Sequence, residues 1–197
     1  MQSATGGGQR SSSATAYLHP NLNRPNLDVL IGAQVTRLIS HTTVPDLRTV
    51  EYAFNATGPR LTLQANREVI LSAGSINTPQ ILLLSGVGDP KELSALGIKS
   101  VINSPGVGQN LQDHPLLEMQ FFSDETLTID TITRNATLAG ELLAQWETNR
   151  TGVYTDVAAN LVGWIRLPDN STVFQNFSDP SPGPTSSHME LLPVVSD

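Results

Sequence analysis

Hydrophobic and polar residues alternate along three short stretches in the first third of the chain, which is the pattern of half-buried β-strands. The alternation covers residues 34–39, 48–54 and 61–65. Residues 55–59, Asn-Ala-Thr-Gly-Pro, are turn-forming, so the second and third stretches are predicted to pair as an antiparallel hairpin. A further strand is predicted at residues 27–31, which are mostly apolar.

Residues 68–88 change from a strand pattern to a helix pattern. The apolar run at residues 68–72 is typical of a strand inside a parallel sheet. After a small-residue turn, Thr78 is the expected N-cap of an apolar helix and Pro79 its first residue. Gly86 is expected to end that helix in the left-handed conformation. The helix has no polar stripe, so it is predicted to be buried on most sides.

The turn between this strand and this helix is a candidate cofactor site. At Ala73 and Gly74 a strand ends and a helix begins, which is where α/β proteins hold nucleotides. A glycine lets the backbone approach a phosphate, and the N–H groups at a helix N-terminus attract negative charge. On the pattern alone, an ordinary strand–helix unit of a protein core is the alternative.

The rest of the chain is predicted to form short elements separated by polar segments. A helix that begins at Asp89 and Pro90 runs to Leu96, and a short strand follows at residues 99–102. Beyond Pro115 the predicted elements are strands at 116–122, 161–166 and 188–195, a helix at 137–146, and polar loops at 124–133 and 169–187. A domain boundary is therefore expected near Pro115.

Composition and charge exclude several classes of function. The 197 residues carry a net charge of −7, which argues against nucleic acid or an anionic membrane surface as a partner. No apolar run approaches the length of a membrane span. The chain has no cysteine, so disulfides, thiolate metal sites and cysteine nucleophiles are excluded, and no metal site is predicted.

Five Asn-x-Ser/Thr motifs favour a secretory origin. They begin at Asn55, Asn135, Asn149, Asn170 and Asn176. The N-terminal segment is rich in Gly, Ser and Gln and has no apolar signal-peptide core. A secreted protein without such a core is expected to have been cut from a longer chain.

Residues 74–88, GSINTPQILLLSGVG, resemble the second signature of the glucose–methanol–choline (GMC) family of flavin oxidoreductases. The similarity extends to residues 9–18, 24–27 and 105–115, and further on it is looser and resembles aryl-alcohol oxidases and dehydrogenases. The resemblance implies an α/β plus α+β fold. A partial FAD-binding (Rossmann-like) domain with a β-meander would occupy residues 1–115, and the start of an antiparallel-sheet substrate domain would occupy residues 116–197.

The resemblance also implies a chemistry. In this family FAD accepts a hydride from an alcohol carbon, a C-terminal histidine removes the hydroxyl proton, and O2 or a quinone reoxidises the flavin. The parent enzyme is expected to be secreted and to act on a small-molecule alcohol, and no oligomeric state is predicted. Val35 matches a position that contacts the adenosine part of FAD through backbone atoms, although a core role for this valine is the alternative. Ala73 and Gly74 are expected to form a wall beside the cofactor rather than its phosphate cradle.

Three parts of the family pattern are missing from this sequence, namely the N-terminal G-x-G-x-x-G, the first signature, and the C-terminal half with its catalytic histidine. Gly106 and Gly108 do not replace the first of these, because Leu111 stands at the third glycine position. His114 lies beside a proline and is expected to be structural, so no catalytic residue is assigned.

The isolated chain is accordingly predicted to be inactive. A secreted, non-catalytic binding module derived from the same fold is the alternative. A hydrolase is not supported, because the sequence has no G-x-S-x-G motif.

Overall fold

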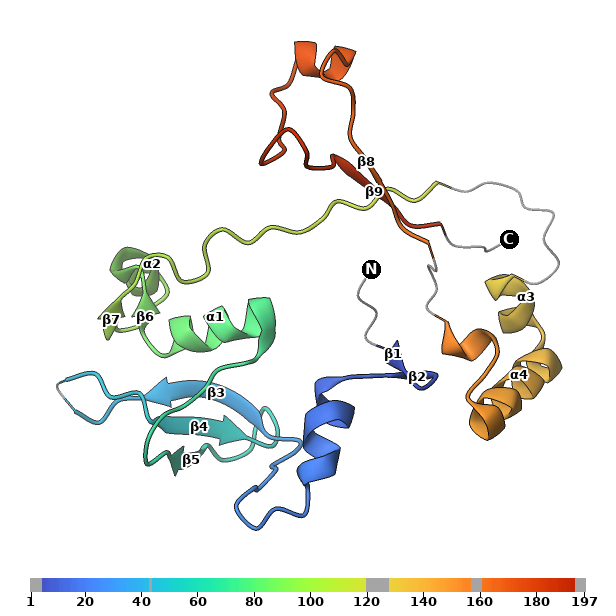
Figure 1. Ribbon diagram of the computed structural model, residues 1–197. Coiled ribbons are helices and arrows are strands. Elements are labelled where there is room, and N and C mark those ends of the chain that lie inside the picture. The colour runs from blue at the N-terminus through green and yellow to red at the C-terminus, as the bar shows by residue number, and fades with distance from the viewer. Residues whose placement is uncertain (1–4, 43, 120–127, 157–160, 194–197) are drawn as a thin grey trace. The chain divides into compact units, whose positions relative to one another are not determined.

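The computed structural model describes residues 5–42, 44–119, 128–156 and 161–193 of the 197-residue chain. It is a mixed α/β structure with small sheets (Figure 1). The chain forms two compact units, a central unit of Asp28–Leu117 and a terminal unit of Met1–Leu27 with Glu118–Asp197. The assignment of residues 1–115 to a FAD-binding domain and 116–197 to a substrate domain stays a prediction.

A three-stranded antiparallel sheet is the main element of the central unit. Its strands are β3 (Gln34–Ile39), β4 (Thr49–Ala53) and β5 (Leu61–Gln64), in the order β3-β4-β5. The predicted alternating strands and their hairpin are therefore confirmed. Leu38 and Ala53 are buried, whereas every residue of β5 is exposed. The core of this unit thus lies on the β3 side of the sheet.

Helix α1 (Gly74–Leu84) starts earlier than predicted. Thr78 is not its N-cap: its hydroxyl oxygen accepts a hydrogen bond from the Ala73 N–H at 2.9 Å, within the first turns of the helix. Pro79 consequently lies inside the helix, beyond the first four N–H groups, and because it has no N–H it removes one intrahelical hydrogen bond. The prediction that this helix is buried on most sides was also wrong, because of its residues only Ile81 is buried and Ile76 is 71% exposed.

Two predicted strands are absent from the central unit. Residues 27–31 and 68–72 have no regular strand structure, and Ile70 is 77% exposed. An apolar run forms a strand when neighbouring strands supply hydrogen bonds and both faces are covered. No described strand lies beside either run, so their composition alone does not produce a sheet.

After α1 the chain forms a short parallel pair with a helix between the strands. Gly86 has φ +81° and ends α1, as predicted. Strand β6 (Val87–Gly88) pairs with β7 (Ile102–Asn103), and helix α2 (Pro90–Ala95) connects them. The predicted start of α2 is confirmed, because the carboxylate of Asp89 accepts a hydrogen bond from the Lys91 N–H at 2.7 Å.

The terminal unit begins with a small hairpin and one short helical segment. Strands β1 (Thr5–Gly6) and β2 (Gln9–Arg10) are joined by Gly7 and Gly8, both with positive φ. Helical turns then cover Ala14–Leu18 and His19–Asn21. The indole N–H of Trp146 donates to the Gly8 carbonyl at 2.7 Å, which attaches the hairpin to the helix described next.

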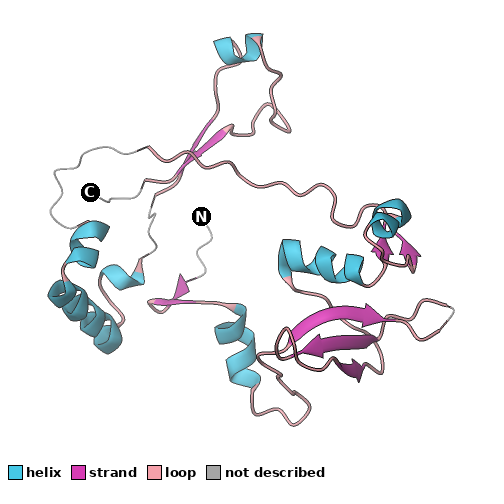
Figure 2. Ribbon diagram, turned by 180° about the vertical axis from the view of Figure 1, so that it is seen from behind, coloured by secondary structure: helices cyan, strands magenta, loops and turns pink. Residues whose placement is uncertain are grey.

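Two α-helices, a strand pair and two short 3-10 helices (Val153–Thr155 and Thr172–Gln175) form the rest of the terminal unit as far as the structure describes it (Figure 2). Helix α4 (Ala136–Asn149) contains the predicted helix at 137–146, and strands β8 (Gly163–Ile165) and β9 (Met189–Leu191) pair within two predicted strands. Helix α3 (Ile129–Arg134) was predicted as polar loop, but Thr128 caps it by accepting the Thr131 N–H at 3.1 Å. The predicted strand at 116–122 lies partly outside the described residues, and its described part is irregular. None of the described helices is long and apolar enough to cross a membrane.

Candidate functional site

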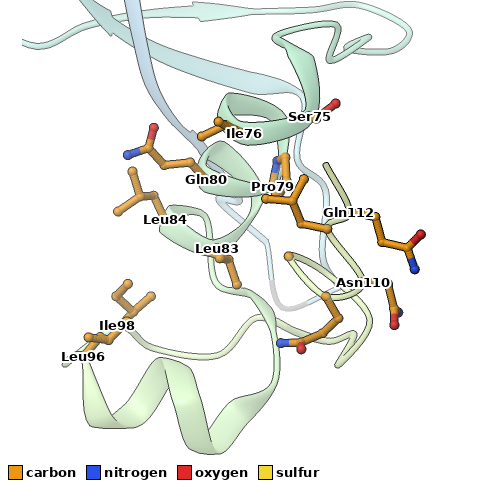
Figure 3. Close-up of a pocket in the computed structure, with 13 residues that line it drawn as sticks. Ser75, Ile76, Pro79, Gln80, Leu83, Leu84, Leu96, Ile98, Asn110 and Gln112 are labelled. Carbon is orange, nitrogen blue, oxygen red and sulfur yellow. The ribbon is translucent and has the colours of Figure 1, made fainter. Parts of the chain in front are cut away.

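A pocket of about 740 Å³ lies in the central unit between α1 and the segment 108–112 (Figure 3). Helix α1 supplies one wall, and the residues that follow α2 supply a second apolar patch. The opposite wall carries amide side chains, which Figure 3 shows on the segment facing α1. The lining residues are Ser75, Ile76, Pro79, Gln80, Leu83, Leu84, Leu96, Ile98, Gly108, Gln109, Asn110, Leu111 and Gln112.

The lining of this pocket contains no titratable side chain. Its polar groups are the hydroxyl of Ser75, the amides of four Asn and Gln residues, and the backbone. Such groups can orient a ligand by hydrogen bonds, and the leucines and isoleucines can cover an apolar face. They cannot accept a proton from an alcohol near neutral pH, so the pocket can bind but supplies no general base.

The three residues predicted to contact a cofactor lie outside this lining. Val35 is half-buried on β3, and Ala73 and Gly74 are exposed at the start of α1. Figure 1 shows β3 and α1 running in the same direction, so the N-terminal end of the strand and the N-terminal end of the helix are at the same end of the unit. Ser75 follows Gly74 directly and does line the pocket.

The local geometry at Ala73 and Gly74 suits close approach by a cofactor. Gly74 has φ +86°, which favours glycine, and a Cβ there would meet no atom within 4 Å. The Ala73 N–H is already used by Thr78, so the amides available to a ligand are those of the first helical turn. These amides point out of the helix N-terminus and favour an anionic or strongly polar group.

The end of the residue 74–88 signature has a packing role. The hydroxyl of Ser85 accepts a hydrogen bond from the Leu38 N–H at 2.7 Å, and both groups are buried. A Cβ at Gly86 would collide with the Lys99 carbonyl oxygen, and a Cβ at Gly88 would lie 2.6 Å from Leu83 Cδ2. These small residues therefore allow α1 to pack closely against its neighbours, and they do not line the pocket.

Arg166, Asp179 and His188 form a polar cluster in the terminal unit that sequence reasoning missed. Arg166 Nη2 lies 2.8 Å from Asp179 Oδ2, and His188 Nε2 lies 2.9 Å from Asp179 Oδ1. The Leu167 N–H donates to His188 Nδ1 at 3.0 Å, so the neutral imidazole carries its proton on Nε2. The same guanidinium donates to the carbonyl oxygen of Ser186 at 2.9 Å.

This cluster fastens the loop at residues 169–187. The hydroxyl and the backbone N–H of Ser181, together with His188 and Arg166, hold the pKa of the Asp179 carboxyl well below its usual range. The charged atoms of Arg166 and Asp179 thus serve to fold the loop back on itself. No local sequence signal marks these contacts, because they join residues up to 22 positions apart.

His114 takes no part in either arrangement. It is exposed, its backbone N–H donates to Asp113 Oδ1 at 2.9 Å, and it does not line the pocket. Among the residues that the structure describes, no group of three or more His, Asp or Glu side chains is placed to hold a metal ion.

Comparisons with known proteins converge on one family. A family model described as GMC oxidoreductase matches residues 1–116. Pyranose dehydrogenase 2 of Leucoagaricus meleagris is 39% identical over 187 residues, which are 94% of this chain and 29% of that protein.

Solved structures give the same result. An FAD-dependent oxidoreductase from Chaetomium thermophilum superposes with a TM-score of 0.70 at 31% identity, covering 81% of this chain and 28% of that one. A fungal aryl-alcohol oxidase gives 0.67 at 27% identity, covering 81% and 27%. The chain therefore spans less than a third of the length of each of these proteins.

Proposed function

Because this chain belongs to the GMC oxidoreductase family, we propose that it forms part of an FAD-dependent enzyme that oxidises a small-molecule alcohol. The resemblance seen in residues 74–88 and the expectation of FAD as cofactor are confirmed by the family match and by the FAD-dependent structures that the chain resembles. In this proposal FAD, when bound, accepts a hydride from the carbon that carries the hydroxyl group. Loss of that hydride to the flavin and of the hydroxyl proton to a base would leave a carbonyl compound, and O2 or a quinone would be the final electron acceptor.

The observation that carries the proposal is the placement of Val35, Ala73 and Gly74 at one end of β3 and α1. Val35 would contact the adenosine part of FAD through its backbone, while Ala73 and Gly74 form a wall beside the cofactor. The open space around Gly74 and the free amides of the first helical turn support this role. Residues 1–115 would then be part of the FAD-binding domain, and residues 116–197 the start of the substrate domain.

The isolated chain is proposed to be inactive as an alcohol oxidase or dehydrogenase. The pocket beside α1 has no titratable side chain, and proton removal from an alcohol requires a base. The proposed substrates are small alcohols, a class that includes sugars, since one relative is a pyranose dehydrogenase and a structural neighbour is an aryl-alcohol oxidase.

A secreted, glycosylated parent enzyme is proposed from the Asn-x-Ser/Thr motifs. Asn55 lies in the exposed turn between β4 and β5, and its Oδ1 accepts the Thr57 N–H at 3.2 Å. Its Nδ2, the atom that carries an N-glycan, is left outside this hydrogen bond. Asn135 and Asn149 are also exposed, but Asn135 caps α4 and Asn149 is its last residue, so both motifs include helical residues rather than lying in a turn. Asn55 is therefore the first site to test by mass spectrometry.

The proposed function is tested on the full-length natural protein and on the isolated chain side by side. The full-length protein should purify with the absorbance of a bound flavin and should reduce it when an alcohol is added. The isolated chain with added FAD should show no turnover. A folded full-length protein without affinity for FAD would refute the enzyme proposal and favour the non-catalytic binding module.

A further inference from the structure

Strand β3 contains an irregularity beside Val35. Val35 pairs with Tyr52 of β4, and Arg37 pairs with Glu51, the residue directly before Tyr52. The chain therefore advances by two residues on β3 where it advances by one on β4. Thr36 is the additional residue of this β-bulge. Bulges occur at sheet edges and beside functional sites, where they change the direction in which backbone groups and side chains point.

The bulge turns the backbone groups of Val35 towards the free edge of the sheet. The Leu38 N–H points away from β4, since it donates to Ser85 Oγ, and Leu38 is opposite Val50. Tyr52 lies two residues after Val50, so its backbone groups have the same orientation and point away from β3. The N–H and carbonyl of Val35, which pairs with Tyr52, therefore also point away from β4. Without the additional residue, the N–H and carbonyl of Val35 would point towards β4 and be used in the ladder between the two strands.

A hydrogen bond from a neighbouring side chain is consistent with this orientation. The Gln34 amide Nε2 donates to the Val35 carbonyl oxygen at 3.1 Å, so this oxygen is reached from outside the β3–β4 ladder. Since β3 is an edge strand, the N–H and the carbonyl of Val35 together form a donor–acceptor pair at an open edge.

Glu51 holds the bulge in place. Its side chain is only 11% exposed, and its Oε1 accepts from the Thr36 hydroxyl at 2.7 Å. Its Oε2 accepts from Arg37 Nη2 at 3.0 Å. One buried side chain on β4 therefore fixes both residues that follow Val35 on β3.

We propose that Glu51 is a positioning residue for FAD binding at the free edge of β3. Its carboxylate fixes the Val35–Arg37 bulge, and the bulge presents the Val35 N–H and carbonyl to the adenosine half of FAD. An adenine ring offers a ring-nitrogen acceptor and an amino-group donor side by side, which complements the backbone N–H and carbonyl of a single residue. The proposal rests on the proposed function, because it requires FAD to bind at this edge.

The test compares FAD with FMN, which has the same flavin but no adenosine. The full-length protein is stripped of flavin, and the dissociation constants of FAD and FMN are measured by quenching of flavin fluorescence. Thr36→Val keeps the shape of the side chain and removes the hydroxyl, and Glu51→Gln removes the charge that pairs with Arg37. Asp46→Asn is the matched control, because it breaks the Asp46–Arg48 ion pair, which does not involve the bulge.

Thr36→Val and Glu51→Gln are expected to raise the FAD dissociation constant about tenfold, the effect of one lost hydrogen bond, and to leave that of FMN unchanged. Asp46→Asn should change neither constant. Equal weakening of FAD and FMN, or no weakening of FAD, would overturn the role of Glu51 while leaving FAD binding itself intact. A wild-type protein that does not bind FAD would instead remove the proposed function.

Hydrogen exchange in the wild-type protein gives a second readout that does not depend on the folding of any variant. Addition of FAD is expected to slow exchange of the Val35 amide more than that of the Arg37 amide, which faces β4. FMN should not reproduce this slowing. An unchanged Val35 amide in the FAD-loaded protein would contradict the proposal.

Discussion

The backbone N–H of Leu38 donates a hydrogen bond to Ser85 Oγ at 2.7 Å, and the same hydroxyl donates to the Ile81 carbonyl. Leu38 lies on the edge strand β3, and Ser85 is the C-cap residue of α1, 47 positions later in the chain. The hydroxyl thus satisfies a buried donor of the sheet edge and attaches the helix to it. This gives the serine of the residue 74–88 signature a structural reason that does not involve the cofactor.

Replacement of Ser85 by alanine tests this link. Ser85→Ala leaves the Leu38 N–H buried without an acceptor, which should lower the free energy of unfolding by about 1–3 kcal/mol. The Leu38 amide should also exchange faster with solvent. Ser94→Ala, on the exposed face of α2, is the control and should change neither quantity. Equal exchange rates in Ser85→Ala and the wild type would show that the hydrogen bond is not needed.

The glycines after α1 should differ from other glycines in their tolerance of alanine. Gly86→Ala forces a Cβ against the Lys99 carbonyl at φ +81°, so its free energy of unfolding should fall by about 2 kcal/mol or more. Gly106→Ala, where a Cβ meets no atom within 4 Å, should stay within about 0.5 kcal/mol of the wild type. Urea unfolding measures both. Similar losses in the two variants would mean that the packing around Gly86 relaxes.

The Asp179 cluster should make stability depend on acid pH. Because the folded-state pKa of Asp179 is lowered, its contribution is complete above the unfolded pKa of about 4 and is lost as the pH falls below it. Asp179→Asn should therefore be less stable than the wild type at pH 7, and the difference should shrink towards pH 3. Asp169→Asn is the matched control: that carboxylate lies 3.4 Å from the same Arg166 guanidinium but is 89% exposed, so its loss should change stability little at any pH. Thermal melting at several pH values tests this prediction. A difference in melting temperature between Asp179→Asn and the wild type that does not vary with pH would contradict the lowered pKa of Asp179.

The indole of Trp146 should control how firmly the β1–β2 hairpin is held. Trp146→Phe keeps an aromatic ring against the Arg150 guanidinium, which lies 4.2 Å from the ring centroid, but removes the donor to the Gly8 carbonyl. Amide exchange at Gln9 and Arg10 should become several-fold faster. Trp164→Phe, at an exposed position of β8, should leave these amides unchanged. Faster exchange in both variants would indicate a general loss of stability instead.

Local sequence patterns were sufficient where an element depends on its own residues. The bounds of β3, the hairpin at residues 55–59, the capped start of α2 and the left-handed Gly86 all follow from alternation, turn chemistry and capping. The motif at residues 74–88 also identified the family, and with it FAD. Charge and composition gave no reason to look for a metal site or a cysteine nucleophile, and they carried no information on contacts.

Features that depend on the surroundings of a segment were decided by the tertiary structure. Thr78 was predicted to cap α1 but accepts the Ala73 N–H inside it, and the apolar residues 68–72 form no strand because no described strand lies beside them. The same holds for the candidate site. Val35 is half-buried in β3, yet only the register with β4 and the hydrogen bond from Thr36 to Glu51, 15 positions away, turn its backbone towards the free edge. A strand pattern specifies which side chains alternate, whereas an additional residue in the pairing is specified by the partner strand, which a single stretch of sequence does not contain.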